Sequence, residues 1–482
     1  MFGYFKKIKY EIIIILLLYS TFLFIGIIVY NDFGISVDEW ELRLHGFSNL
    51  IYLYEFLFKK VPLDIVSNEI IPKMSDYFGT HGPIFNLFTA FLEYFFNIED
   101  SRSYYLMRHY INNLIFIIGN FYFYLLVKQR FNDWLYGLLG AIFLFCSPRI
   151  FAESFYNHKD IIFLSLFIIS LYYGIRFYKV PSYKNIVLFS LFTALAIDIR
   201  IMGIIIIPVI IFFTYENHFE SNKKIVLRII IFLVLVSIFT ITFWPYLWKS
   251  PLINFYKVFR TLSAFGHEGY NFYLGSYHLS SNPPWHYILI WILATTPILY
   301  LFLFFYGFIV YSLRIFNNIK KYINNNIFKQ LWNDDTNGED FIYYILFILP
   351  IFIVIILNST LYTGWRHLFF IYPCFLIISI QGIHYIKNNY FKRKNFQIIM
   401  LLLIFISQII FSMVKYHPHQ NVYFNFLAGN KVEKLFELDY WGLANKQAFE
   451  YILENDERDT IKVGSAGPIS LENSKKIFNF KG

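Results

Sequence analysis

The amino-acid sequence predicts an all-α polytopic membrane protein with about eleven transmembrane helices. Of its 482 residues, 57% are hydrophobic and only 15% are charged, and the mean hydropathy is +0.50. Residues 12–30 form an uncharged run that, as a helix rising about 1.5 Å per residue, crosses a hydrocarbon layer of about 30 Å. Ten further apolar runs follow it.

The later runs are separated by short polar connectors. They are residues 104–127, 134–147, 161–177, 186–197, 201–215, 229–247, 286–313, 341–357, 367–386 and 396–414. Residues 83–96 are short for a crossing and contain Asn86 and Glu93. We expect that stretch to lie along the outer surface. The predicted membrane domain is therefore 1–414, followed by a small extracytoplasmic tail, 415–482.

Basic residues set the orientation, because connectors rich in Lys and Arg stay on the cytoplasmic side. With 83–96 excluded from the spans, the basic connectors all fall inside. These residues are Lys6, Lys7, Lys9, Lys128, Arg130, Arg176, Lys179, Lys184, Lys223, Lys224, Arg228, Lys320, Lys321, Lys329, Lys387, Lys392, Arg393 and Lys394. The loop 31–103 and the tail are then outside. Residues 186–215 must form a hairpin that turns at Asp198 and Arg200.

The first outer loop begins with an acidic pair, Asp38 and Glu39, directly after the first span. Carboxylates at a membrane boundary can be tuned for proton transfer, although a solvated loop is the plainer interpretation. Apolar residues then recur at intervals of three and four between Leu42 and Leu57, which predicts an amphipathic interfacial helix.

Composition excludes several function classes. The net charge of +9 comes from the basic connectors, so it reports topology and contact with lipid headgroups, not nucleic-acid binding. Cys146 and Cys374 lie in or beside apolar runs and indicate neither a disulfide nor a thiolate metal site. The sequence has no phosphate-binding glycine-rich loop and no internal repeat typical of transporters.

Polar residues gather at the predicted outer ends of the spans. Ionisable groups embedded in apolar runs are costly and usually line a cavity. The members are Asp38, Glu39, His81, Arg108, His109, Glu153, His158, Lys159, Asp160, Asp198, Arg200, Arg366 and His367. A carboxylate can take the proton of an acceptor hydroxyl, and Arg can stabilise a phosphate leaving group. The set therefore suits transfer from a phosphate-linked lipid donor.

Structural alternatives remain open for these residues. Arg108 and Arg366 could extend to lipid headgroups, and Arg200 could form an ion pair with Asp198. His158 and Asp160 could cap the following helix.

Metal and cofactor chemistry have little support in the sequence. His417 and His419 are the closest pair of candidate metal ligands, and their spacing alone is weak evidence. We therefore expect no cofactor requirement and no metal site, while a divalent metal stays conceivable but unsupported.

The motifs, in their order, resemble the GT-C glycosyltransferases, in particular the protein O-mannosyltransferase and aminoarabinose-transferase branch. Residues 37–39 resemble the acidic motif of the first outer loop, and residues 77–83 a proline-containing motif before a juxtamembrane helix. Arg108 resembles the Arg that opens the second span, and residues 147–160 the second outer loop with its closing Asp. Residues 199–203 and 365–373 are similar to later motifs of the family.

The resemblance implies a polyprenyl-phosphate sugar donor and an inverting transfer. It implies Asp38 as the catalytic base with Glu39 assisting, and donor-phosphate contacts from Arg108, Arg200, Arg366 and His367. His81, His158, Lys159 and Asp160 would line the substrate pocket. The expected location is a bacterial inner membrane, with the site on the periplasmic face. His81 stands where the aminoarabinose branch commonly has Lys, which favours hexosyl transfer over lipid A modification; pentosyl transfer stays open.

Two other classes compete with this interpretation. A transporter or flippase of a lipid-linked saccharide would need polar residues near the middle of the membrane and access from both sides. A membrane polysaccharide polymerase or ligase could share the topology, but the acidic pair beside the first span favours the glycosyltransferase. The acceptor, whether glycan, lipid or protein, is not legible in the sequence.

Overall fold

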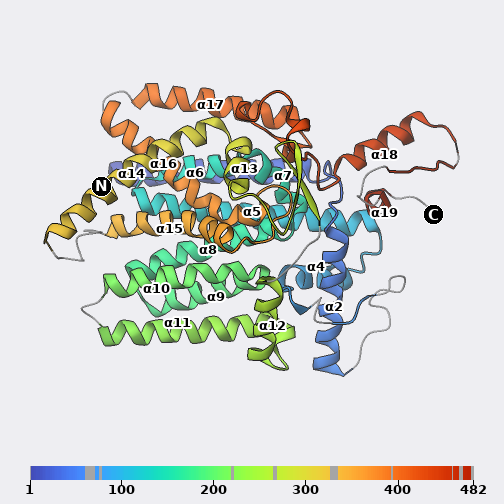
Figure 1. Ribbon diagram of the computed structural model, residues 1–482, viewed down its shortest axis with the longest axis horizontal. Helices are drawn as coiled ribbons and strands as arrows, with labels where there is room; N and C mark the ends of the chain where they lie inside the picture. The colour runs from blue at the N-terminus through green and yellow to red at the C-terminus, as the bar shows by residue number, and fades with distance from the viewer. Residues whose placement is uncertain are drawn as a thin grey trace.

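Apolar helices build almost all of the described structure, so the protein is an all-α polytopic membrane protein (Figure 1). The computed structural model describes residues 2–59, 71–74, 79–218, 222–263, 269–325, 335–391, 395–458, 460–465 and 471–478. The long helices are α1 (Phe2–Val29), α2 (Glu39–Phe58), α5 (Ser101–Phe131), α8 (Asp160–Lys179), α9 (Tyr183–Ile199), α11 (Asn222–Phe243), α14 (Ile298–Asn325), α15 (Asp335–Ile356), α16 (Tyr372–Tyr390) and α17 (Asn395–Tyr416). The shorter ones are α4 (Ile84–Phe95), α6 (Trp134–Phe145), α7 (Pro148–Tyr156), α10 (Ile206–Asn217), α12 (Pro251–Ser263), α13 (Tyr287–Thr295), α18 (Ala444–Asn455) and α19 (Leu471–Ser474).

Eight helices in the described ranges are long and apolar enough to cross a membrane, or nine if the bent pair α6 and α7 forms one span. That pair bends by 66° where Pro148 starts a new helix after Ser147. Helices also cover the remaining predicted runs, 186–197 and 201–215, but α9 and α10 fall short of full span length or hydropathy. The predicted run 286–313 is divided between the short α13 and the spanning α14. The total of eleven spans therefore stays a prediction. Parts of the predicted basic connectors, including Lys329 and Lys392 to Lys394, lie outside the described residues.

The predicted hairpin of residues 186–215 is confirmed. Helix α9 ends at Ile199, Arg200 has extended backbone, and the 3-10 turn η1 (Ile201–Ile205) leads into α10. His218, just after α10, contacts the carbonyl of Tyr178 near the end of α8 at 2.9 Å. The chain therefore returns to the end of the bundle from which α9 started.

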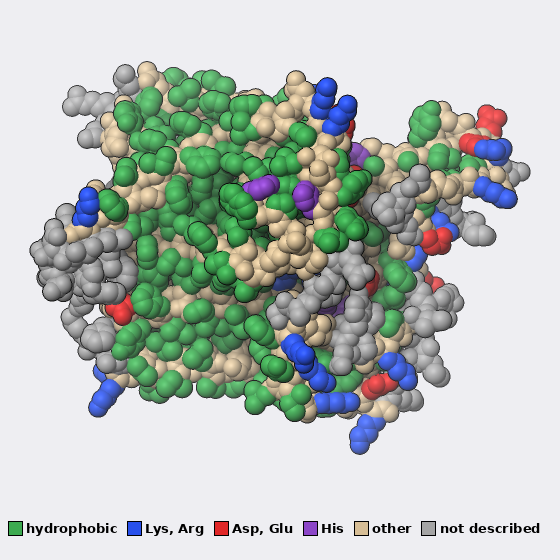
Figure 2. Space-filling view, viewed as in Figure 1, with side chains coloured by type: hydrophobic (Ala, Val, Ile, Leu, Met, Phe, Trp, Pro, Cys, Tyr) green, Lys and Arg blue, Asp and Glu red, His purple; other side chains and the backbone are tan. Residues whose placement is uncertain are grey.

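Two helices run across one end of the bundle. Figure 1 shows α2 and α12 roughly perpendicular to the spanning helices. Phe47 and Leu50 of α2 pack on Ala90 of α4, whereas α12 exposes Leu252 and Tyr256. Hydrophobic side chains also cover the visible flank of the bundle, and charged ones gather toward its two ends (Figure 2). These features agree with interfacial helices beside a membrane domain.

Glycines allow a close contact between helices α14 and α16. A Cβ added to Gly307 would lie 2.2 Å from the carbonyl oxygen of Ile378, and one added to Gly382 would lie 2.2 Å from that of Leu303. Larger residues would force the two backbones apart. Small residues permit close helix packing inside membranes, where dispersion contacts drive association.

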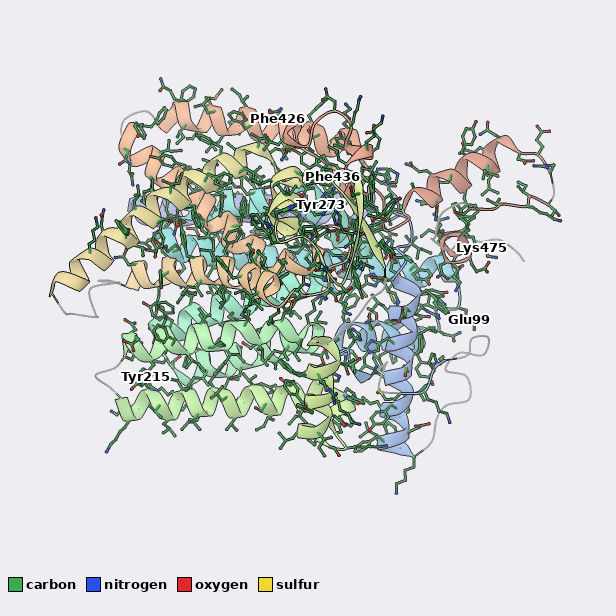
Figure 3. The ribbon with its side chains drawn as sticks, viewed as in Figure 1. Glu99, Tyr215, Tyr273, Phe426, Phe436 and Lys475 are labelled. Atoms are coloured by element: carbon green, nitrogen blue, oxygen red, sulfur yellow. The ribbon has the colours of Figure 1, made fainter. Side chains whose placement is uncertain are left out.

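Buried ion pairs tie the helices together at the end opposite the tail. Arg130 at the end of α5 pairs with Asp340 of α15, and Lys179 at the end of α8 pairs with Glu339. Both carboxylates are fully buried. Figure 3 places Tyr215 of α10 at this end and Lys475 of the tail at the other. The pairs thus fix helix ends that the sequence predicts to be cytoplasmic.

The tail folds back onto the first loop and the start of α5. A two-stranded hairpin from the loop before α13, β1 (Tyr270–Tyr273) with β2 (Ser276–Leu279), also reaches the tail. Tyr273 forms an isolated bridge with Phe436, and the two labelled side chains lie together in Figure 3. Farther along, Ile477 packs with Tyr104 and Tyr105 of α5. The tail is therefore packed against the membrane domain.

A buried charge network joins α2, α4 and α5. Glu93 of α4 accepts hydrogen bonds from Arg43 of α2, at 2.5 and 2.9 Å, and from Arg108 of α5, at 3.1 Å. Arg108 also donates to Thr89 at 2.6 Å. Glu93 and Arg108 are 3% and 0% exposed. The Glu93 carboxylate thus compensates the positive charge of two buried guanidinium groups.

We predict that Glu93→Gln lowers the free energy of unfolding by about 3 kcal/mol, because removing one partner leaves buried charge without compensation. Denaturant unfolding of the purified protein in detergent would measure this change in the free energy of unfolding. Glu99→Gln is the matched control, since Glu99 is exposed on the same loop. Equal stability of both variants would contradict the role given to Glu93.

Candidate functional site

Four of the predicted residues form one chain of charges at the end of the bundle that carries the tail. Asp38 accepts a hydrogen bond from Nη1 of Arg366 at 3.0 Å. The same nitrogen lies 3.9 Å from Oδ2 of Asp160, whose Oδ1 pairs with Arg200. Carboxylates and guanidinium groups therefore alternate along this chain, although the four residues come from distant parts of the sequence.

Local structure at the start of α8 fixes Asp160 at the centre of this chain. The side-chain oxygen of Asn157 accepts hydrogen bonds from the backbone N–H of Lys159, at 3.3 Å, and of Asp160, at 2.9 Å. Its amide nitrogen donates to Oδ2 of Asp160 at 3.0 Å. Asp160 lies in the first turn of α8, where the helix dipole favours a negative charge. Lys159 is the N-cap residue of α8 and makes no side-chain cap hydrogen bond, so the first N–H groups of this turn are satisfied by Asn157 and not by Asp160.

The two acidic residues of the first loop have different environments. The Asp38 side chain is 44% exposed, whereas Glu39 is fully buried. Glu39 lies 2.9 Å from Nε2 of His109 and accepts a hydrogen bond from the backbone N–H of Ser36 at 3.1 Å. Both of its oxygens are therefore engaged within the protein. Only Asp38 of the pair is open to a substrate.

Aromatic rings surround the Arg366 guanidinium. Its Cζ lies 4.3 Å from the ring centre of Trp441, 5.2 Å from Tyr362 and 5.9 Å from Tyr440. Cations over aromatic faces are stabilised, more so when both are removed from water. Within the described part of the chain, Nε of Arg366 and Nε of Arg200 are buried without a hydrogen-bond partner. The guanidinium groups of Arg366 and Arg200 thus each have an Nε–H group beside Asp160 that can still donate a hydrogen bond.

Glu153 lies next to this chain of charges. It accepts hydrogen bonds from Asn157 at 2.7 Å and from the hydroxyl of Tyr440 at 3.1 Å. Burial and the neighbouring Glu153 carboxylate raise the pKa of Tyr440 well above its usual range, so this phenol stays protonated and donates. The tail is therefore hydrogen-bonded directly to the site.

Two neighbours of Asp160 have lowered pKa values. Burial, and then the positive charge of Arg200, lower the pKa of Lys159 to about 7. Burial and the nearby His109 lower the pKa of His158 well below its usual range. The His158 ring packs 5.2 Å from Phe85, and neither of its nitrogens has a hydrogen-bond partner among the described residues. Lys159 can therefore change charge near neutral pH, while His158 stays neutral.

The other predicted residues lie at the edge of this cluster or away from it. Arg108 is held in the Glu93 network. His81 contributes its backbone carbonyl to His45, at 3.1 Å, and His367 packs beside Tyr362 at 4.9 Å. Asp198 accepts a hydrogen bond from the backbone N–H of Ile84 at the start of α4, at 2.9 Å. Arg200 consequently pairs with Asp160 and not with Asp198.

Glu153 was predicted to lie among the polar residues at the outer ends of the spans, but it was given no role in the site. Asn157, Tyr440 and Trp441 were not predicted. Glu153 and Asn157 are one helical turn apart, a spacing that could have suggested a shared face. Nothing near Tyr440 or Trp441 in the sequence indicates that the tail returns to this place. Part of the predicted motif 77–83, Tyr77 and Phe78, lies outside the described residues.

The cluster can bind an anion and move a proton. Guanidinium groups present planar donors that match phosphate and carboxylate oxygens, and an exposed carboxylate beside them can accept a proton. In the described ranges, no group of three or more His, Cys, Asp or Glu side chains could hold a metal ion.

Part of the chain is similar to a known protein family. Residues 80–245 match the model of the dolichyl-phosphate-mannose-protein mannosyltransferase family. The matched segment includes Lys159, Asp160 and Arg200, but neither Asp38 nor Arg366. No curated protein matches the sequence. Together with the apolar helices, the family similarity supports an integral membrane glycosyltransferase of the GT-C type.

Proposed function

We propose that this protein transfers a sugar from a polyprenyl-phosphate carrier to an acceptor hydroxyl, with inversion at the anomeric carbon, on the extracytoplasmic face of the membrane. The observation that carries the proposal is the chain of charges from Asp38 through Arg366 and Asp160 to Arg200. It combines an exposed carboxylate with two guanidinium groups at one end of a membrane bundle. The family match over 80–245 supports a lipid-linked donor in general terms.

Arg366 and Arg200 would hold the phosphate of the donor. Each keeps a buried Nε without a partner, and a phosphate oxygen would satisfy such a donor with a charge-assisted hydrogen bond. Asp160 lies between the two cations and holds both in place. Negative charge develops on the phosphate oxygen as the sugar leaves, so these groups stabilise the transition state more than the ground state.

Asp38 would be the base. It removes the proton of the acceptor hydroxyl while the acceptor oxygen forms a bond to the anomeric carbon of the sugar. The bond between that carbon and the phosphate oxygen breaks, and its electron pair stays on the carrier phosphate. A single displacement of this kind inverts the anomeric configuration. Glu39, buried against His109, would hold the loop that presents Asp38.

The contact between Asp38 and Arg366 links donor binding to base activation. The guanidinium of Arg366 donates a hydrogen bond to the Asp38 carboxylate at 3.0 Å. A phosphate that takes over Arg366 would free this carboxylate for the acceptor hydroxyl. We propose a hexosyl rather than a pentosyl donor. Screening of glycan, lipid and protein acceptors would identify the acceptor class.

We predict that Asp38→Asn lowers the turnover by about 10²- to 10⁴-fold, because the amide keeps the size of the side chain but cannot accept a proton. Transfer of labelled sugar from polyprenyl phosphate in membranes measures the effect, and donor binding should persist. Glu39→Gln should lose activity together with stability, since Glu39 is buried. Full activity of Asp38→Asn would overturn the assignment of the base.

We predict that Arg366→Lys raises the donor KM at least tenfold, because Lys lacks the planar fork that meets both a phosphate and the ring of Trp441. Initial rates over a range of donor concentrations would measure this rise in KM. Arg102→Lys, at an exposed position at the start of α5, is the control. An unchanged KM would instead favour an Arg366 that only reaches toward lipid headgroups.

We predict that kcat/KM for the donor falls by up to about tenfold between about pH 6 and about pH 8. Lys159, with its pKa lowered to about 7, is an ammonium below that value and a neutral amine above it. A phosphodiester keeps one negative charge over this range, so only the protein changes. Lys159→Met should reduce the fall, and the exposed Lys415→Met should keep it. Glu153→Gln measures the share of the buried Glu153 carboxyl beside the same charges. If Lys159→Met keeps the wild-type pH profile of kcat/KM, another titrating group causes the pH dependence.

A further inference from the structure

The tail returns to the loop that carries Asp38. The backbone N–H of Val37 donates to the carbonyl oxygen of Trp441 at 3.1 Å. A Cβ added to Gly34 would lie 2.7 Å from the carbonyl oxygen of Leu443. Lys446 donates to the carbonyl oxygen of Asn31 at 2.6 Å. Residues 31–37 are therefore packed, backbone against backbone, on residues 441–446.

The turn that leads into this segment is held by Asp439. Its carboxylate accepts hydrogen bonds from the side chain of Asn421 at 3.2 Å and from the backbone N–H of Ala444 at 2.8 Å. The turn carries Tyr440 and Trp441 toward the bundle. Their position is consequently set by several contacts within the tail as well as by the site.

The Trp441 side chain lies under Arg366. The ring centre is 4.3 Å from the guanidinium carbon, and the residue is only 1% exposed. Tyr156 of α7 meets the same indole edge-on at 5.8 Å. A planar cation stacked on a buried indole has little freedom to tilt. Trp441 therefore restricts the orientation of Arg366.

One residue thus contacts both functional parts of the site. Through its backbone Trp441 holds the loop of Asp38, and through its ring it holds Arg366. Tyr440 adds a hydrogen bond to Glu153 at 3.1 Å. A displacement of about 1 Å between a base and the group that binds the leaving phosphate can cost about 10²-fold in rate. The contacts that Trp441 makes with the Asp38 loop and with Arg366 therefore set the distance between Asp38 and Arg366.

We infer that the segment 439–446 is part of the catalytic site and that Trp441 is a positioning residue, which holds the base loop and the phosphate-binding Arg366 in register. This inference rests on the proposed function. It assigns to the tail a role in donor binding and in alignment of the two reacting groups. Trp441 would act through Arg366 and the Asp38 loop, since its ring lies against the Arg366 guanidinium and its carbonyl oxygen accepts from Val37.

The test compares Trp441→Leu and Trp441→Phe with the wild-type chain. Leu keeps an apolar side chain but removes the ring, so we expect kcat/KM for the donor to fall about tenfold or more, mainly through a raised KM. Phe retains a π face and should recover most of this loss. Tyr451→Leu is the control, since Tyr451 is 68% exposed in α18 of the same tail. Thermal unfolding of each variant, measured in parallel, separates misfolding from misalignment.

A second variant keeps the test decisive if Trp441→Leu does not fold. In Gly34→Ala the added methyl group would meet the backbone of Leu443 and push the tail away from the loop, so the donor KM should rise while the Trp441 ring is intact. Wild-type kinetics in a folded Trp441→Leu, or in Gly34→Ala if Trp441→Leu does not fold, would overturn the role of the tail. Absence of transfer by the wild-type chain from any polyprenyl-phosphate sugar would overturn the proposed function, and this inference with it.

Discussion

The buried carboxylate of Asp160 is the group on which the arrangement of the site depends. It is 1% exposed, and a charge removed from water in this way needs close opposite charges and hydrogen bonds. Arg200, Arg366 and Asn157 provide them. Satisfying this one carboxylate draws together the start of α8, the end of α9 and the start of the turn Arg366–Ile371. The geometry proposed for catalysis follows from this electrostatic requirement.

Sequence patterns could predict the helices because the signal for each is local. A run of apolar residues and its basic flanks identify a helix and its orientation without knowledge of its neighbours. The gathering of Asp38, Asp160, Arg200 and Arg366 could be predicted in the same way, because each follows or opens an apolar run at the same predicted surface. Topology alone brings such residues to one end of a bundle.

The contacts that depend on tertiary structure were beyond these patterns. Arg108 lies near the start of α5 at the predicted outer surface, yet its guanidinium is engaged by Thr89 and Glu93 and not by Asp160. Trp441 meets Arg366 because the tail folds back, and no periodicity in the tail indicates its destination. Glu39 follows Asp38 directly, but the start of α2 buries one side chain and leaves the other partly exposed. Which residue faces a substrate is thus decided by packing.

The hydrogen bond between Asp38 and Arg366 joins residues 328 positions apart. Contacts of such long sequence separation form late, because the intervening chain must first be ordered. The contact of Trp441 with Arg366 requires nearly the whole described chain. During synthesis, the first loop therefore enters the membrane environment well before its partners exist. A nascent chain that stops before residue 441 would expose Asp38 without the segment that packs on its loop, so the alignment of Asp38 with Arg366 would be completed only after residue 441 has been made.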